Sequence, residues 1–159
     1  MAMSEAIRIK PHHLVDIIGR AGEAVPVFRP HPYGHAFHTV AEKVLADPDI
    51  SVRMELGADD VCAPCSHNIA GRCDDVIDTS YRPDAPPGKR EWNLLIDRRW
   101  CELLGLRQGD VLTARLFALR LRERMGDLGD VYREIPADRT VQRQRMLELG
   151  LIRLLKGEG

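Results

Sequence analysis

Apolar residues recur at three- and four-residue spacing in several segments of the chain, which is typical of helices with one buried face. The first such segment, residues 11–20, begins with Pro11, and proline favours the first turn of a helix. Gly19 or Gly22 can end this helix. The pattern also predicts helices over residues 34–45, 98–104 (capped by Asp97) and 111–125, and a last helix from about residue 136 that is interrupted near Gly150.

Strict alternation of apolar and polar residues occurs from Ile50 to Leu56, and this period of two predicts a half-buried strand. Residues 7–10 alternate in the same way over a shorter span, which suits a short strand or an extended lead-in. Residues 81–90 are rich in proline and glycine and predict an excursion over the surface. The predicted fold is therefore mainly α with one or two short strands, an α+β class.

Length and composition favour one compact domain. The chain has 159 residues, of which 44% are apolar and 30% charged, enough for a core and for a solvated surface. The 23 basic and 24 acidic residues nearly cancel, which gives no support for a nucleic-acid partner or an acidic membrane. No apolar run approaches the roughly 20 residues that span a bilayer, and residues 1–10 lack the apolar core of a signal peptide. We therefore expect a cytoplasmic protein without a membrane partner.

Three of the four cysteines lie in one short run with the spacing C-x2-C-x7-C, formed by Cys62, Cys65 and Cys73. Thiols stay reduced in the cytoplasm, so a close cysteine group there favours metal binding or catalysis over disulfides. Two cysteines separated by two residues can direct both sulfur atoms to one point, as zinc and iron–sulfur sites require. Zinc modules typically pair two such motifs. The single close pair here favours an iron–sulfur cluster, with zinc as the alternative.

A closed site of this kind needs a fourth ligand, and the residues offer three candidates. Cys101 is the remaining cysteine, although its place beside Trp100 on an amphipathic stretch also suits a small buried apolar residue. His67 lies inside the cysteine run. The third candidate is the helical face that carries His12, His13 and Asp16, because residues three and four apart are neighbours on a helix.

Other polar residues have a role or a simpler explanation. His35 and His38 are three residues apart and can line a pocket, but surface positions explain them as well. Asp59 and Asp60 precede the first cysteine, where they either fix a histidine tautomer or simply form a turn.

Three segments together resemble the domain of unknown function 1284 family, which consists of small bacterial and archaeal proteins described as iron–sulfur-binding. They are residues 7–14 with the Pro-His-His motif, residues 57–65 with Asp-Asp-x-Cys-x-x-Cys followed by Cys73, and residues 103–110. The resemblance covers roughly residues 7 to 120 with gaps. It implies an iron–sulfur site near Cys62, but it implies no established reaction.

The chain departs from the family pattern at one place that matters for the site. In that pattern the His-His pair is followed by Leu-Leu-Cys, and the cysteine falls on Asp16 of this chain. The resemblance therefore implies that Asp16 replaces a thiolate as an oxygen ligand, or that Cys101 supplies the fourth thiolate. An ion pair between Asp16 and an arginine is the third alternative. His12 and His13 match the family pattern and are the candidate catalytic residues, as acid–base groups or as donors to a sulfur.

We therefore expect an iron–sulfur protein, with a 4Fe-4S cluster favoured over 2Fe-2S, held by Cys62, Cys65 and Cys73 and completed by Asp16 or Cys101. Residues 1–125 would form the cluster-binding domain, and residues 126–159 a helical extension packed on the core or on a second subunit of a homodimer. An enzyme with lyase- or hydrolase-type chemistry is favoured, because a weak fourth ligand leaves an iron open as a Lewis acid. The expected partner is a small-molecule substrate or a redox protein. The alternatives are a simple electron carrier and a small helical binding module with structural zinc.

Overall fold

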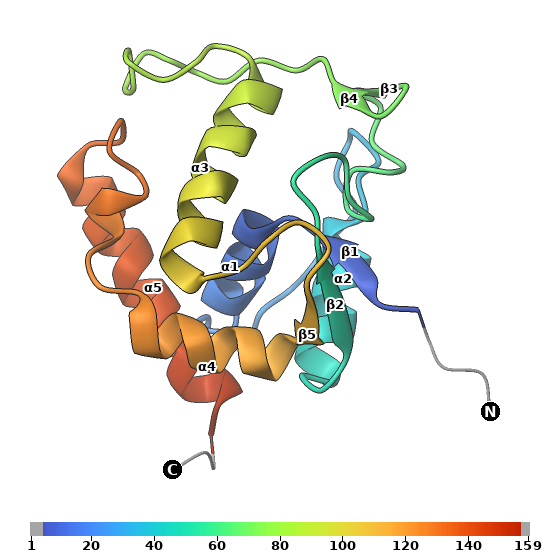
Figure 1. Cartoon of the computed structure of the whole chain (residues 1–159), viewed down its shortest axis with the longest axis vertical. Helices are drawn as coiled ribbons and strands as arrows, with labels where there is room; N and C mark the ends of the chain where they lie inside the picture. Colours follow the sequence, from blue (N-terminus) through green and yellow to red (C-terminus); the bar gives the residue numbers. More distant parts are fainter. Residues whose placement is uncertain (1–4, 157–159) are drawn as a thin grey trace.

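A computed structural model describes residues 5–156 of the chain. Helices dominate, and α1 (Pro11–Arg20) lies at the centre of the others (Figure 1). It packs against α2 (Phe37–Ala46), α3 (Lys89–Leu104) and α5 (Ala137–Leu154), while α4 (Ala114–Arg124) packs against α3 and α5. The 3-10 helix η1 (Leu128–Asp130) joins α4 to α5. The predicted α+β class is confirmed.

A small sheet of three strands lies beside the helices, in the order β1 (Ile7–Ile9), β2 (Ser51–Met54) and β5 (Val111–Thr113). The first two strands are parallel and pair Ile9 with Met54, whereas β5 is antiparallel to β2. Val52 and Met54 are buried and their neighbours Ser51 and Arg53 are exposed. The alternating pattern therefore predicted this strand correctly, although the strand is shorter than residues 50–56.

The core forms around the apolar side of α1, where Leu14, Ile17 and Ile18 are completely buried. Two glycines allow α5 to approach α1 closely. A Cβ at Gly150 would collide with the carbonyl oxygen of Ile18, and one at Gly22 would lie 2.5 Å from the carbonyl oxygen of Met146. The predicted interruption near Gly150 is wrong, because α5 continues to Leu154 and the glycine serves close packing instead of a helix end.

Two other predicted boundaries are also wrong. Helix α3 begins at Lys89, so Asp97 lies in the middle of the helix and is completely buried, where it cannot be an N-cap. Residues 111–113, predicted as helix, form strand β5, and the side chain of Thr113 then caps α4 by accepting a hydrogen bond of 3.0 Å from the backbone N–H of Leu116.

The cysteine run connects the sheet to a short hairpin of β3 (Asn68–Ile69) and β4 (Arg72–Cys73). The two turn residues, Ala70 and Gly71, have φ values of 51° and 84°. Positive φ at both central residues suits the type I′ turn that joins twisted strands. The turn brings Cys73 back beside Asn68, so the third cysteine returns towards the first two.

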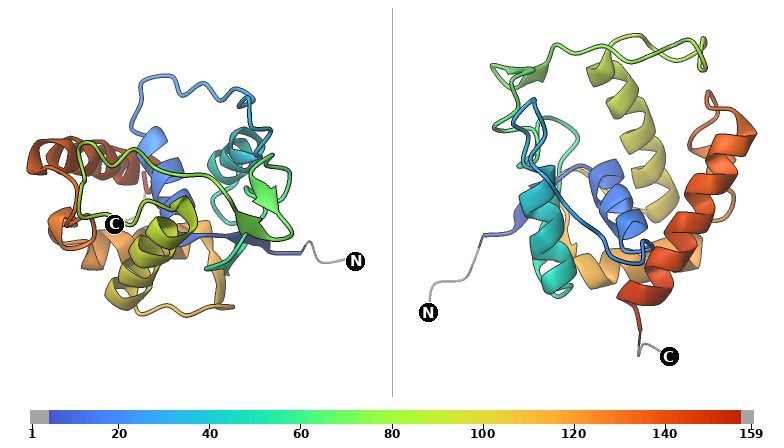
Figure 2. Two further views of the ribbon diagram at one scale, coloured as in Figure 1. Left: turned by 90° about the horizontal axis from the view of Figure 1, so that it is seen from above. Right: turned by 180° about the vertical axis from the view of Figure 1, so that it is seen from behind.

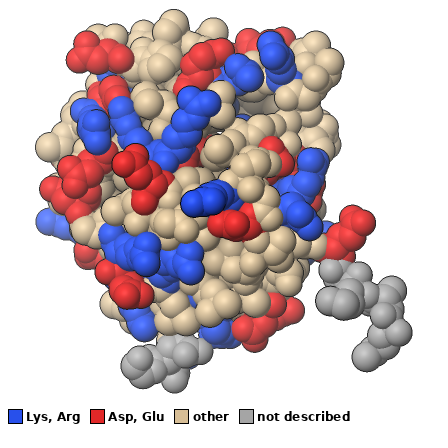
Figure 3. Space-filling model, viewed as in Figure 1, with Lys and Arg blue, Asp and Glu red and all other residues tan. Residues whose placement is uncertain are grey.

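The segment between β4 and α3 reaches towards the N-terminal end of α5 before it returns to α3 (Figures 1 and 2). The guanidinium of Arg139 lies 3.8 Å from the ring centre of Tyr81 and holds this excursion against α5. Basic and acidic side chains are interspersed over the face shown in Figure 3. No helix among residues 5–156 has the length and apolar character needed to cross a membrane.

Candidate metal centre

One pocket of about 550 Å³ collects most of the candidate residues. Its walls come from the first turns of α1 and α3, from residues 56–65 after β2, and from the β3–β4 hairpin. Six of the predicted site residues line it: His12, His13, Asp16, Cys62, Cys65 and Cys73.

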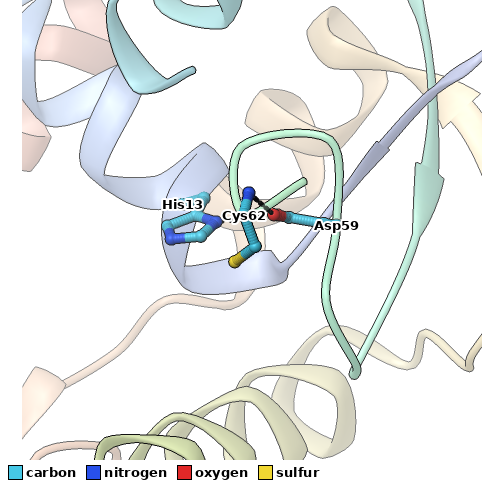
Figure 4. Close-up of side chains that lie close together, drawn as sticks. All are labelled: His13, Asp59 and Cys62. Carbon is cyan, nitrogen blue, oxygen red and sulfur yellow. Dashed lines mark hydrogen bonds and ion pairs between the residues drawn. The ribbon is translucent and has the colours of Figure 1, made fainter. Parts of the chain in front are cut away.

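His13, Asp59 and Cys62 form the tightest group in this pocket. One nitrogen of His13, one carboxylate oxygen of Asp59 and the sulfur of Cys62 all lie within 4.8 Å of one another. His13 comes from the first turn of α1, and the other two come from the loop after β2, so the loop folds directly over the start of the helix (Figure 4). Imidazole nitrogen and thiolate sulfur are the ligands that zinc and iron favour in proteins.

Asp59 holds the other two residues in place. It is completely buried, and its oxygens accept hydrogen bonds from the backbone N–H of Lys10 (2.7 Å) and of Cys62 (2.9 Å). Its Oδ2 also lies 2.7 Å from Nδ1 of His13. Burial alone would disfavour the charged carboxylate, but His13 and the two N–H groups outweigh it and lower the pKa of Asp59. Asp59 is therefore ionised at neutral pH.

An ionised carboxylate only accepts hydrogen bonds, so Nδ1 of His13 carries the hydrogen. The other nitrogen, Nε2, then keeps its lone pair for a metal or a proton. This carboxylate–histidine arrangement is the one that orients imidazole ligands in metal sites. Burial and the neighbouring His12 lower the pKa of His13, which keeps the ring neutral and able to bind a metal.

His12 forms a second pair of the same kind with Asp97. Its Nδ1 lies 2.8 Å from Oδ2 of Asp97, and its backbone N–H donates to Oδ1 at 2.7 Å. Burial opposes the charge on His12, but the Asp97 carboxylate outweighs that effect and raises the pKa of the imidazole. The rings of His12 and His13 are 4.3 Å apart between centres. Two carboxylate-supported imidazoles therefore line the same pocket side by side.

The three clustered cysteines share the pocket but not the tight group. All three are half-buried, and Cys62 alone is close enough to join His13 and Asp59. Hydrogen bonds from the backbone N–H of Cys65 to the carbonyl of Cys62 (2.9 Å) and from Asn68 to Cys65 (3.0 Å) fold the loop. Burial and the charge of Asp59 raise the pKa of Cys62 to about 11, so a metal that binds its sulfur has to displace a proton.

The candidates for the fourth ligand lie in different places. Cys101 is buried in α3 and is not part of the pocket lining, and burial raises its pKa to about 11. Asp16 lines the pocket, but its Oδ1 accepts a hydrogen bond of 2.9 Å from Arg143. His67 pairs with Asp74 outside the lining. His13 is thus the member of the predicted set that lies beside a cysteine sulfur.

The remaining histidines divide between the pocket and its surroundings. His35 lines the pocket and stacks on the ring of His31 with a centre distance of 4.4 Å, whereas His38 is not part of the lining. Asp97 was not among the site residues predicted from the sequence. Its spacing offered a signal, because Asn93, Asp97 and Cys101 recur every four residues and place a carboxylate on the buried side of the helix.

Comparison of the chain with family models, with curated proteins and with solved structures gave no match. The resemblance to the domain of unknown function 1284 family therefore stays a prediction.

Proposed function

We propose that the chain is an iron–sulfur cluster-binding protein whose pocket is a site of chemistry. Cys62, Cys65 and Cys73 would hold the cluster, and His13 would be its fourth protein ligand. One observation carries the proposal: the His13 imidazole and the Cys62 sulfur lie together at a pocket that also contains the other two cysteines. His13 is favoured over Asp16 and Cys101, because Asp16 is paired with Arg143 and Cys101 lies outside the lining.

The spread of the sulfur atoms favours a cluster over a single ion. Thiolates that share one tetrahedral zinc at about 2.3 Å lie about 3.8 Å from one another. Cys62, Cys65 and Cys73 do not form a group with all ligand atoms within 4.8 Å. A 4Fe-4S cluster distributes its thiolate ligands over separate irons and suits such a spread.

Zinc is the second candidate, and the donor set supports it. One imidazole and three thiolates make up a common structural zinc site. The loop that carries Cys65 and Cys73 would have to close on Cys62 and His13 to surround one ion. In that case the site would stabilise the fold, and the pocket would be a binding site.

The pocket and its paired histidines favour an enzyme over an electron carrier. A bound cluster with an exchangeable ligand supplies a Lewis acid. His12 has Nδ1 committed to Asp97, so its Nε2 can take or deliver a proton at a bound molecule. Asp97 holds the ring in that tautomer and stabilises its charged form. We infer lyase- or hydrolase-type chemistry on a small molecule, with His12 and His13 as the acid–base and ligand residues.

Anaerobic purification followed by iron, sulfide and zinc analysis tests the proposal. The wild-type protein is expected to contain iron and sulfide in equal amounts and to absorb visible light. Cys62→Ser, Cys65→Ser and Cys73→Ser are expected to lose most of that iron. Cys101→Ser is the matched control, because it replaces a thiol outside the pocket and should keep the iron and the spectrum.

Three results would count against the proposal. Zinc without sulfide would favour the structural site, and retention of iron in Cys62→Ser would remove the central ligand. A wild-type protein that binds neither iron nor zinc would reject a metal centre altogether.

A further inference from the structure

Lys10 is an unusual residue in the wall of the pocket. Its side chain belongs to a residue that is 4% exposed, and it lines the cavity beside the histidines. Among residues 5–156, no carboxylate or other acceptor binds its ammonium group, although its backbone N–H donates to Asp59. The ammonium is not among the unpaired polar atoms that are sealed from solvent, so it is accessible from the cavity, where an anionic ligand can pair with it.

Asn93 presents a second polar group of the same kind. It is 7% exposed, it lines the pocket from the first turns of α3, and its side-chain amide has no hydrogen-bond partner within the described part of the chain. Lys10 and Asn93 come from segments far apart in the sequence, yet both are buried around one cavity. Together they offer a charged donor and a neutral donor to the same occupant.

The first turns of two helices add to the positive potential. Lys10 just before α1, and His12 and His13 in its first turn, line the pocket. Helix α3 contributes Lys89 and Arg90, which pair at their outer ends with Asp75 and Glu91. The backbone N–H groups at the start of α1 are already bonded, that of His12 to Asp97 and that of His13 to the carbonyl of Lys10, so side chains supply the positive charge here. Among residues 5–156, Asp16 is the one carboxylate in the lining, and it pairs with Arg143. Asp59 and Asp97 lie behind the two histidines, each bonded to one of them.

Part of the lining is apolar, which favours an organic anion over an inorganic one. Phe37, Leu56, Val61 and Leu94 contribute side chains to the same cavity. Inorganic phosphate has no apolar surface to pack against these side chains, whereas an organic carboxylate has both a charge and a hydrocarbon part. Lys10 lies two residues before His12 and lines the same cavity as Cys62, so a carboxylate at Lys10 would lie beside the proposed metal ligands.

We propose that the pocket binds a small organic carboxylate, with the Lys10 ammonium and the Asn93 amide holding the carboxylate and the apolar wall holding its hydrocarbon part. That this carboxylate is the substrate rests on the proposed function, whereas the binding itself needs no metal. Lys10 is then a substrate-binding residue, and His12, in the first turn of α1, lines the same cavity.

Calorimetric titration with isobutyrate tests the binding, and isobutyramide is the uncharged probe of the same shape. Isobutyrate is expected to bind saturably and isobutyramide about tenfold or more weakly, because a charge-assisted hydrogen bond is lost. Lys10→Met is expected to lower the affinity for isobutyrate by a similar factor. Lys10→Arg, which keeps the positive charge, is expected to bind isobutyrate more tightly than Lys10→Met. Lys43→Met removes an exposed lysine of α2 and should leave the affinity unchanged.

Three outcomes would overturn the inference: no saturable isobutyrate binding, equal affinity in the wild type and Lys10→Met with an unchanged circular dichroism spectrum, or inorganic phosphate binding more tightly than isobutyrate. Metal content measured on the same samples separates this inference from the proposed function. Protein that holds iron but does not bind isobutyrate refutes only the carboxylate site, and protein that binds isobutyrate without iron or zinc refutes only the metal centre.

Discussion

The two sides of the pocket differ in what holds their side chains. On the helical side, His12 and His13 each bind a completely buried carboxylate, at 2.8 and 2.7 Å. On the loop side, the three cysteines are half-buried and stand on a short loop and a hairpin of two-residue strands. The imidazoles are therefore placed by the protein alone, whereas the sulfur atoms have a looser support that a bound metal would complete.

Two buried carboxylates, Asp59 and Asp97, both support the helical side of the pocket. A buried carboxylate is tolerated only when hydrogen bonds satisfy it, and both Asp59 and Asp97 are satisfied by histidines and backbone N–H groups. Each of these carboxylates links α1 to a distant segment. The comparison predicts that changes on the helical side affect stability, and that changes on the loop side affect metal binding.

The largest effect is expected for Asp97→Ala. The change leaves the backbone N–H and the ring N–H of His12 without acceptors in the interior, which should lower the free energy of unfolding by about 3 kcal/mol. Urea denaturation of metal-free protein measures it. Asp74→Ala is the control, because it removes the exposed partner of His67 and should leave the midpoint unchanged. Equal urea midpoints for the two variants would contradict the claim that the pair of His12 and Asp97 stabilises the fold.

The next effect concerns Asp59, which belongs to both sides. Asp59→Asn keeps the shape but weakens the support of His13 and Cys62, and loss of such a group typically lowers metal affinity about 10- to 100-fold. Competition with a zinc chelator measures the change. Asp60→Asn alters the neighbouring carboxylate, which binds Arg8 at the surface, and should keep wild-type affinity. Similar affinities in both variants would show that Asp59 does not position the ligands.

A third effect follows from the protonated thiol of Cys62. Its pKa of about 11 means that zinc must displace a proton at neutral pH, so apparent affinity should rise at least about tenfold per pH unit between pH 7 and 9. His13 is neutral in this range and adds no competing proton. Chelator competition at several pH values gives the slope, and Cys62→Ser should reduce it by about one proton. An unchanged slope in that variant would exclude Cys62 as a ligand.

The smallest effect is expected in the hairpin turn. Ala70 has a positive φ of 51°, which costs a residue with a Cβ about 1 kcal/mol relative to glycine. Ala70→Gly should therefore slow hydrogen exchange at residues 68–73 without shifting the global unfolding midpoint. The matching change Gly71→Ala, at a φ of 84°, should speed exchange there. Exchange that changes in α1 as well would show that the two sides of the pocket are coupled.

Local patterns were enough to predict the parts of the molecule that depend on neighbouring residues. Pro11 and the apolar spacing after it located α1, and alternation located β2. The cysteine spacing located the loop that lines the pocket. Helical spacing also placed His12, His13 and Asp16 together, and all three do line it.

Long-range packing decided the features that local patterns could not predict. Aspartate is common at helix N-caps, so the local sequence favours that role for Asp97. Only the approach of α1 makes it the partner of His12. Gly150 resembles a helix end, and only its contact with Ile18 explains its place inside α5. Lys10 is one of several lysines in the sequence, and its burial beside the pocket depends on the loop that carries Asp59.

The partners of the two histidines also bear on the order of events during folding. His12 and Asp97 are separated by 85 residues and His13 and Asp59 by 46. Contacts across such long stretches of chain form late, because closing the loop between them costs entropy before the contact is made. A nascent or partly folded chain therefore has cysteines but no oriented imidazoles beside them. Metal binding at the complete site would then require a folded chain, so bound metal would distinguish the folded protein from its partly folded precursors.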